Sequence, residues 1–415
     1  MTTIMLEHAP KDWPIKRISQ LFKERKEKVS DRDFPPLSVT KKGILSQLDT
    51  AAKTDDGDNR KGVRAGDFVI NSRSDRKSSG GVSDRKGSVS LINLVLEPRG
   101  IYPRFAHHLL RSTAFQEEFY RWGHGIVADL WTTRYSKMKN IRIAIPECKT
   151  QQAIANFLDC EITRIDQLIE KKRTLLDLLE EKRQVLITRV VTKGLNPDTP
   201  MKPSGIDWLG DIPAHWEVFR LKLLASEPLT YGANAAADLG EPDWPRFVRI
   251  TDIDDLGRLR PETYRSLPPD IAEGFLLKEN DILLARSGAT VGKSFIYDPS
   301  WGIACYAGYL VRARIKKTNS ARFIYWFMKS VSYREWVRSN FIQNTIQNIS
   351  SERYANLCIP MPPLDMQRRI AQFLDKQTEQ LNGLSAKVHK SIEKLTEYRA
   401  ATITSAVTGQ LTDLQ

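Results

Sequence analysis

The sequence lacks the features that would assign it to several common protein classes. Its 415 residues include only 4 cysteines, and no two of them form a Cys-x-x-Cys pair. Neither a zinc site nor a disulfide framework is therefore indicated. No apolar run reaches the ~18 residues that a transmembrane helix needs, and the first residues contain no apolar signal core. We therefore expect a soluble, cytoplasmic protein without a metal site.

Recognisable catalytic motifs are also missing. The six histidines form no His-Glu-x-x-His pattern. The chain has no Asn-Pro-Pro-Tyr or Asp-Pro-Pro-Tyr segment of the kind that an adenine methyltransferase uses, and no pattern supports a nuclease carboxylate cluster. The sequence thus gives no positive evidence of an enzyme or of a cofactor bound by this chain.

Acidic residues are too few to balance the basic ones. The chain carries 63 Lys and Arg against 50 Asp and Glu, a net charge of +13. Such an excess favours polyanionic partners, with DNA or RNA first and an anionic membrane second. The alternative is a solvated basic surface without a partner.

What the sequence does contain is an internal repeat. The stretch Pro146 to Leu195 recurs 216 residues later, without a gap, at Pro362 to Leu411. Polar residues such as Gln151 and Asp159 match in register, which a shared helical period alone would not produce. The repeat therefore reflects a duplicated architecture.

The repeat predicts five segments. Outside the best-matched block the offset drifts, so each half consists of a variable globular part followed by a helical part of constant length. A Pro- and Gly-rich stretch separates the halves. The predicted segments are a first globular domain at 1–145, a helical spacer at 146–195, a linker at 196–210, a second globular domain at 211–360 and a second helical spacer at 361–415.

The repeated blocks predict long helices. Gln151 to Val191 contains no Pro or Gly, and its apolar residues follow an alternating spacing of three and four, which is typical of a coiled coil. We expect the two helices to pack on each other antiparallel, which gives a pseudo-two-fold axis; alternatively, each helix folds back on its own globular part. Leu168 and Leu175 widen the apolar stripe enough for further packing partners. The predicted interface residues are Ile165, Ile169, Leu176, Leu179, Leu381, Val388, Ile392 and Leu395.

The globular parts are predicted to mix helix and sheet, so that the fold class is α+β. Asp281–Ala285, Phe247–Ile250 and Tyr309–Ile315 have the composition of strands. Ala321–Ser339 is predicted as one helix, with Ala106–Trp122 as its counterpart.

One loop in each half is a candidate DNA contact. Ser287–Ser294 is similar to a phosphate-binding P-loop, but Ser287 stands where the first glycine belongs and a strand is expected afterwards instead of a helix. Nucleotide binding is thus the lesser alternative, and a basic loop that approaches DNA is preferred. Its counterpart, Asn71–Gly81, has different residues, as expected for two recognition loops with different targets; the alternative is a flexible surface loop.

Arg, Asn and Gln can recognise base edges, while Lys and backbone amides hold phosphates. A second candidate segment, Gln343–Asn348, carries four side-chain amides that suit base edges or turns equally well. The candidate DNA-binding residues are Asn71, Arg73, Arg76, Lys77, Arg85, Arg134, Arg286, Ser287, Gly288, Thr290, Lys293, Gln343, Asn344 and Gln347.

Several motifs together carry a family resemblance. They are the repeated Pro-x-x-x-x-Gln-x-x-Ile-Ala-x-Phe-Leu-Asp, the lead-in Ser204–Trp216, Asp281–Arg286 and Ile359–Pro363. Together they resemble the specificity subunit of type I restriction–modification systems, over essentially the whole chain. The first half departs from this pattern, because it keeps only Pro10 and Trp13 of the lead-in.

The resemblance implies two target-recognition domains that alternate with two conserved helical regions, the latter forming an antiparallel spacer. Each domain would recognise one part of a split, asymmetric DNA sequence, and the subunit would have no catalytic activity. It would bind two methyltransferase subunits, which use S-adenosylmethionine, and recruit restriction subunits that use ATP and Mg. Two half-sites at a fixed separation do require a rigid spacer. The alternative function is a coiled-coil scaffold that binds DNA without sequence preference.

Overall fold

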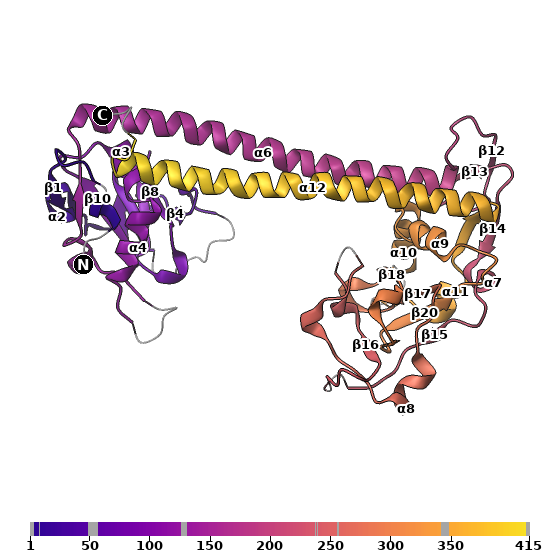
Figure 1. Cartoon of the computed structure of the whole chain (residues 1–415). Helices are drawn as coiled ribbons and strands as arrows, with labels where there is room; N and C mark the ends of the chain where they lie inside the picture. Colours follow the sequence, from indigo (N-terminus) through magenta and orange to yellow (C-terminus); the bar gives the residue numbers. More distant parts are fainter. Residues whose placement is uncertain are drawn as a thin grey trace. The chain divides into compact units, whose positions relative to one another are not determined.

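The computed structural model describes residues 4–7, 9–48, 57–125, 131–236, 238, 240–254, 257–341 and 348–411. The chain divides into two compact units: a first unit, Met1–Arg173 with His389–Gln415, and a second unit, Thr174–Val388. Each unit combines one globular part with one half of each long helix, α6 (Cys148–Lys193) and α12 (Leu364–Val407) (Figure 1).

The globular part of the first unit is built on a four-stranded antiparallel sheet in the order β2–β10–β7–β8. Smaller sheets pair β1 with β11, β4 with β5, and β3 and β9 with β6. Helices α3 and α4 supply Phe105, Phe115 and Phe119 to the core. The elements are α1 (Ile4–Glu7), β1 (Ile15–Arg17), α2 (Ile18–Leu21), β2 (Phe22–Glu24), β3 (Lys28–Val29), β4 (Leu37–Thr40), β5 (Gly43–Ser46), β6 (Arg60–Val63), β7 (Phe68–Asn71), β8 (Gly80–Val82), β9 (Gly87–Val89), β10 (Asn93–Pro98), α3 (Pro103–Leu109), α4 (Thr113–Arg121), α5 (Tyr135–Met138) and β11 (Arg142–Ala144).

The second unit repeats this plan. Its main sheet has the order β15–β20–β17–β18, and β14 pairs with β21 as β1 pairs with β11. A parallel pair, β16 and β19, is added. The elements are β12 (Met201–Pro203), β13 (Asp211–Pro213), β14 (Glu217–Arg220), α7 (Leu221–Leu224), β15 (Thr230–Tyr231), β16 (Arg246–Val248), α8 (Pro269–Ala272), β17 (Asp281–Ala285), β18 (Ser294–Ile296), β19 (Ala304–Tyr306), β20 (Leu310–Arg314), α9 (Ala321–Phe327), α10 (Val331–Phe341), α11 (Ser351–Ala355) and β21 (Cys358–Met361).

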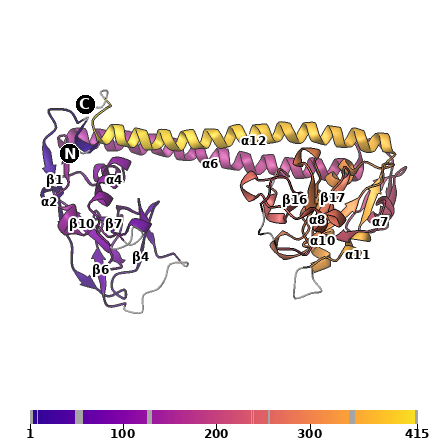
Figure 2. The ribbon, with the colours of Figure 1, turned by 60° about the horizontal axis from the view of Figure 1, so that its bottom comes forward.

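The long helices run antiparallel, as predicted. In the first unit the beginning of α6 lies beside the end of α12, where Arg399 Nε donates to Asp166 Oδ1 at 2.9 Å. In the second unit the end of α6 lies beside the beginning of α12 (Figures 1 and 2). The mixed fold class with two paired long helices is therefore confirmed.

The predicted seam is buried to different degrees along the helices. Ile165, Ile169 and Leu381 are buried, while Leu176, Leu179, Val388, Ile392 and Leu395 are half-buried. The helices also pack on their globular parts, through Ile154, Ala155 and Leu158 in the first unit and Ile370, Ala371 and Leu374 in the second. The two packing modes that the sequence left open thus occur together.

Two predicted helices are wrong in one respect, because each is broken in the middle. The segment 321–339 forms α9 and α10, and the segment 106–122 forms α3 and α4. At each break a serine begins the next helix. Ser330 Oγ accepts from the amide of Tyr333 at 3.2 Å, and Ser112 Oγ accepts from the amide of Phe115 at 3.3 Å. A serine cap of this kind stabilises a new helix start by about 1 kcal/mol.

In the first half, the short helix α1 stands at the positions that align with part of the lead-in. Residues 204–210 bring Trp208 to within 6.5 Å of Phe327, measured between ring centroids. At the offset of Trp13 from Trp216, the counterpart of Trp208 is Met5. Met5 lies in α1 with 2% of its surface exposed and belongs to the core of the first unit. Met5 and Trp208 thus each pack against the core of their own unit.

A glycine ends each long helix, and a tryptophan packs on it. Gly194 and Gly409 have φ of +80° and +76°, the left-handed conformation in which a helix commonly ends. A Cβ on Gly194 would lie 3.4 Å from Trp216, and one on Gly409 would lie 3.2 Å from Trp13. Strand β12, in the segment 196–210, pairs with β13, which follows this segment. No helix among the described residues is long and apolar enough to cross a membrane.

Candidate nucleic-acid interface

The first recognition loop, residues 71–79, connects two strands of the main sheet. It leaves the buried strand β7, makes one 3₁₀ turn at Ser74–Arg76 and enters β8. Ser78 closes the loop with φ +63°, a conformation that is uncommon for a residue other than glycine. The amide of Asn71 donates to the carbonyl of Ser79 at 3.0 Å, so the loop is anchored at both ends.

The charged residues of the first loop are close to one another. Arg73 and Arg76 both approach Asp75, with Nε–Oδ distances of 3.1 and 3.8 Å. Lys77 Nζ lies 5.5 Å from the centre of the Tyr120 ring. Burial raises the pKa of the Tyr120 hydroxyl to about 12, so that ring stays neutral. The loop presents three cations against one carboxylate.

The second recognition loop, residues 286–293, has the same construction. It follows β17, makes a 3₁₀ turn at Gly288–Thr290 and enters β18. Gly292, with φ +82°, occupies the place of Ser78. Strand β18 stands where a P-loop requires a helix, so the nucleotide-binding alternative loses its structural context.

A later segment of each half adds a bridge to its loop. Arg73 forms an isolated β-bridge with Thr132, and Ser287 forms one with Asn348. The predicted amide-rich segment therefore adjoins the second loop at Asn348, whereas Gln343, Asn344 and Gln347 lie outside the described residues. The flexible-loop alternative is not supported, because both loops are bonded to the sheet and to this second segment.

Arg286 is held in a defined position. Its guanidinium lies 4.3 Å from the centre of the Tyr231 ring, and its Nε lies 3.5 Å from Asn348 Oδ1. Tyr231 is fixed in turn, because its hydroxyl accepts from the amide of Ser351 at 2.9 Å. The half-buried arginine is thereby preorganised, with terminal NH₂ groups that can bond a planar acceptor pair.

A buried ion pair fixes the start of each central strand. Asp281 is fully buried and receives both Nε and Nη2 of Arg314 at 2.8 Å. Asp67 receives Arg25 in the same way, at 2.8 and 3.1 Å. Sequence reasoning missed this role, although both aspartates stand in the repeated strand motif. A buried pair of this kind loses about 3–5 kcal/mol when one partner is removed.

The repeated Gln–Asp motif attaches each globular part to a long helix. Gln367 accepts from the amide of Ser320 and donates to the carbonyl of Pro362, both at 2.8 Å. Asp375 Oδ1 accepts from Arg322 Nε at 2.8 Å and from Trp326 Nε1 at 2.9 Å. These contacts tie α9 to α12 within the second unit.

The first unit has the same attachment. Gln151 bonds the amide of Tyr102 and the carbonyl of Pro146, both at 2.8 Å. Asp159 bonds Arg104 and, at 2.7 Å, His108 Nε2 in place of a tryptophan. The signal for these roles was the match of polar residues in the repeat, which indicated a polar contact but not its partner.

Two further predicted DNA-binding residues lie outside the loops. Arg85 is exposed, pairs with Asp84 at 2.6 Å and donates to Ser46 Oγ at 3.0 Å. Arg134 is exposed and precedes α5. The structure thus brings together Asn71, Arg73, Arg76 and Lys77 in one loop and Arg286, Ser287, Gly288, Thr290 and Lys293 in the other.

Comparison with known proteins identifies the domain type. Residues 237–394 match the family described as "Type I restriction modification DNA specificity domain". The chain is 27% identical over 214 residues to the specificity subunit of the type I restriction enzyme EcoKI from Escherichia coli (strain K12), covering 49% of this chain and 45% of that protein. It is 26% identical over 213 residues to the StySPI specificity subunit from Salmonella potsdam, covering 49% and 45%. The chain thus spans about half the length of these curated relatives.

Solved structures resemble the fold over nearly the whole chain. A chain from a study of complex assembly and conformational transition of the type I R-M system has a TM-score of 0.75 at 16% identity, covering 97% of this chain and 99% of that one. The HsdS subunit from Thermoanaerobacter tengcongensis has a TM-score of 0.56 at 18% identity, covering 97% and 98%. Part of the chain is thus similar in sequence to type I restriction–modification specificity subunits, and its fold resembles solved structures from that system.

Proposed function

We propose that the chain is the sequence-specific DNA-binding subunit of a type I restriction–modification complex. Each globular part recognises one half of a split, asymmetric DNA site through its recognition loop. The observation that carries this proposal is that both units present the same strand–turn–strand loop with different side chains. A common scaffold with different contact residues suits two different half-sites.

The net charge supports DNA as the partner. The chain carries a charge of +13, and Lys or Arg occurs in both recognition loops. Positive charge supplies the sequence-independent part of DNA affinity, while base contacts supply the specificity. The guanidinium of Arg286, stacked on Tyr231, has terminal NH₂ groups that can bond the N7 and O6 atoms of guanine.

The long helices are proposed to set the spacing between half-sites and to bind two methyltransferase subunits. Large apolar side chains remain exposed along them, namely Leu168, Leu175, Leu178, Val185, Leu384 and Tyr398. Exposed apolar patches of this kind mark protein interfaces. The subunit itself would perform no catalysis: the methyltransferase would use S-adenosylmethionine, and restriction subunits would use ATP and Mg.

Methylome sequencing tests the proposal directly. A host that lacks other methyltransferases would express this chain together with its methyltransferase subunit. We expect methylation at one bipartite motif with an unspecified gap, and DNase footprinting should show two protected patches on that motif. Uniform protection of unrelated DNA would favour a scaffold that binds DNA without sequence preference and would contradict the proposal.

A further inference from the structure

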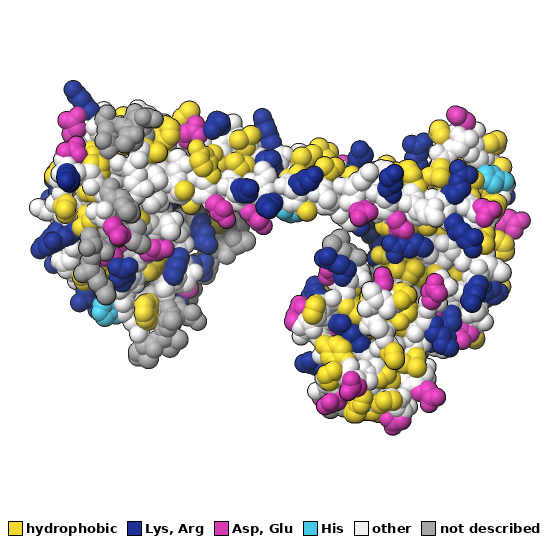
Figure 3. Space-filling view, viewed as in Figure 1, with side chains coloured by type: hydrophobic (Ala, Val, Ile, Leu, Met, Phe, Trp, Pro, Cys, Tyr) yellow, Lys and Arg dark blue, Asp and Glu magenta, His cyan; other side chains and the backbone are white. Residues whose placement is uncertain are grey.

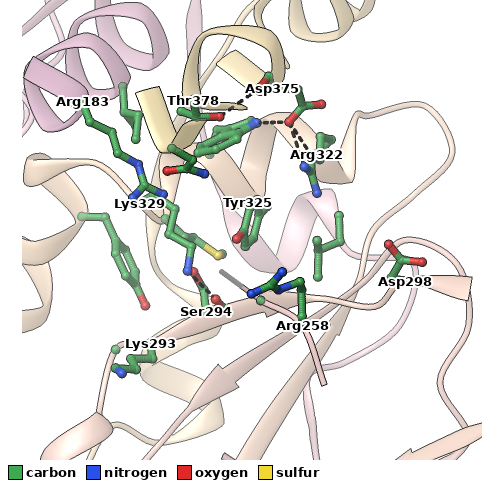
Figure 4. A pocket seen from close by; sticks show the side chains of 18 of the residues that line it. Arg183, Arg258, Lys293, Ser294, Asp298, Arg322, Tyr325, Lys329, Asp375 and Thr378 are labelled. Carbon is green, nitrogen blue, oxygen red and sulfur yellow. Dashed lines mark hydrogen bonds and ion pairs between the residues drawn. The ribbon is translucent and has the colours of Figure 1, made fainter. Parts of the chain in front are cut away.

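A large cavity opens in the second unit beside the second recognition loop. Its volume is about 1270 Å³, and its wall combines α6, α12, the helices α9 and α10, and strand β18 (Figure 4). Arg183 enters it from α6, Lys329 from the segment between α9 and α10, and Lys293 from the loop itself. All of these elements belong to the second unit, so the cavity forms within one compact body.

The wall of the cavity is predominantly basic. Seven Lys and Arg side chains line it, against four Asp and Glu side chains. The space-filling view shows dark-blue side chains gathered on the second unit, just below the long helices (Figure 3). Two of the carboxylates are already engaged, because Asp375 bonds Arg322 at 2.8 Å and Glu180 lies 3.5 Å from Arg183.

Two of the arginines are bonded only to neutral oxygens among the described residues. Arg246 Nη2 donates to the carbonyl of Arg260 at 2.7 Å, and Arg334 Nη2 donates to Gln184 Oε1 at 2.8 Å. These partners orient the guanidinium groups without neutralising their charge. The cavity therefore retains positive charge that an anion can compensate.

The wall also contains buried polar atoms without a partner. Within the described part of the chain, Arg183 Nε, Arg246 Nε and Ser294 Oγ have no hydrogen-bond partner, and Ser294 is 1% exposed. All three residues line the cavity. Buried polar atoms without partners are uncommon and costly, so the polar wall of this cavity is incompletely satisfied by the described residues.

At the equivalent place in the described part of the first unit, a hairpin lies against the surface. Arg111 is the counterpart of Lys329, and its Nη2 donates to the carbonyl of Lys41, in the turn between β4 and β5. A Cβ on Gly81 would lie 3.2 Å from the backbone of Gly43, so this hairpin covers the surface closely. The described residues at this place thus differ between the units, although both share the same attachment to the long helices.

We propose that this cavity binds phosphate groups, supplied by the backbone of the DNA whose bases the second loop recognises. The inference rests on the proposed function, because Lys293 and Ser294 at the end of that loop form part of the wall. Guanidinium groups bond phosphate bidentately, and those of Arg246 and Arg334 have no acidic partner among the described residues. The second unit would thus hold the DNA backbone and recognise bases with adjacent surfaces.

Salt dependence of DNA binding tests the proposal. The purified complex with the methyltransferase subunit would carry Arg246→Gln, Arg334→Gln or both, and binding to the methylated motif would be measured over a series of salt concentrations. Each lost phosphate contact should reduce the slope of log K against log salt by about 0.9, while the recognised sequence stays the same. Lys278→Gln, an exposed charge at the opposite end of β17, should leave the slope unchanged.

A charge-retaining variant separates binding from folding. Arg246→Lys keeps the charge but loses the planar donor group, so its slope should remain close to that of the unchanged protein. If Arg246→Gln and Arg246→Lys lower the melting temperature by the same amount, a difference between their slopes of log K against log salt supports phosphate binding, because the stability loss is common to both. If the Arg246 and Arg334 variants show the same salt slope as Lys278→Gln, the cavity does not bind the DNA backbone and the proposal is overturned.

Calorimetry with pyrophosphate and with ATP distinguishes the source of the phosphate. Suppose that the DNA-free complex binds pyrophosphate or ATP and that the double variant loses this binding. If the salt slope of DNA binding is unchanged in that variant, the cavity binds a free phosphate ligand and not the DNA backbone. No change in either measurement would eliminate phosphate binding. Failure of the unchanged complex to prefer any DNA sequence would instead contradict the proposed function, and the pyrophosphate measurement would still test the cavity.

Discussion

At the scale of single residues, the contacts that matter most are those that hold a side chain still. Arg286 is supported by Tyr231 on one side and by Asn348 on the other. An arginine that is already ordered loses less conformational entropy when it binds. The same logic applies to the buried pair of Asp281 and Arg314, which fixes the strand that presents the second loop.

Arg286→Lys should weaken discrimination at one base pair of one half-site. A lysine cannot bond guanine in the planar, two-pronged manner of arginine, and a good bidentate pair contributes about 1–3 kcal/mol of discrimination. Competition binding between the motif and its single-base variants measures the loss. Arg220→Lys, an exposed arginine in β14, is the matched control; loss of discrimination at several positions would contradict a single base contact.

The first unit should be less stable in mild acid than at neutral pH, because His107 is buried in its neutral form. Burial, followed by the nearby charges of Arg111, His108 and Arg399, lowers the pKa of its imidazole from 6.5 to about 3. Between these values the unfolded chain binds one proton more than the folded chain. The free energy of unfolding therefore falls as the pH drops from about 6.5 towards 3, by at most about 1.4 kcal/mol per pH unit for this group.

The measurement is the free energy of unfolding of the first unit, obtained by chemical denaturation at several pH values. His107→Asn should flatten the slope in this window, whereas His124→Asn, at an exposed position, should leave it as it is. Equal slopes for the unchanged chain and His107→Asn would show that His107 does not contribute.

At the scale of elements, attachment of the globular parts to the helices depends on few polar contacts. Gln367 is 3% exposed and bridges α9 to the start of α12. Gln367→Ala should lower the free energy of unfolding of the second unit by about 1–3 kcal/mol, because it leaves a buried amide without a partner. Gln380→Ala, exposed on the same helix, should change it little, and thermal unfolding compares the two.

Paired deletions in the long helices test the spacing role. Removing one heptad from α6 and the matching heptad from α12 shortens the pair by about 10 Å. If the helices set the separation, the gap in the methylated motif should shorten by about three base pairs while both half-sites keep their sequences. Methylome sequencing reports both quantities; an unchanged gap would show that the helices do not set it. The same deletion in α6 alone should disrupt the seam and abolish methylation.

At the scale of the whole molecule, the duplication predicts that the units recognise DNA independently. Replacing residues 1–145 with those of another family member should change one half-site and leave the other intact. The reciprocal replacement of residues 211–360 serves as the control and should change the other half-site alone. Methylome sequencing of both hybrids is the measurement, and a change in both half-sites from either hybrid would contradict independence.

The sequence predicted the parts of this protein that depend on local or repeated patterns. The long helices follow from an apolar spacing without Pro or Gly. Strand β17 has the predicted bounds because it consists of four apolar residues preceded by Asp281, which pairs with Arg314. The breaks in the two predicted helices were missed because Ser112 and Ser330 act as caps only where the backbone turns, and the local sequence does not show where it turns. The core position of Met5 was missed because its side chain differs from that of Trp208, with which it aligns at the offset between the halves.

The sequence by itself determined the duplication, the two long helices and the position of one loop in each half, since these follow from periodicity and matched register. Only the tertiary structure decided which partners the repeated polar residues bind, because those partners lie about fifty residues away along the chain. It also decided that Tyr231 and Asn348 hold Arg286, and that the second unit keeps a basic cavity where the first is covered by a hairpin. Such contacts arise from packing, and no local pattern encodes them.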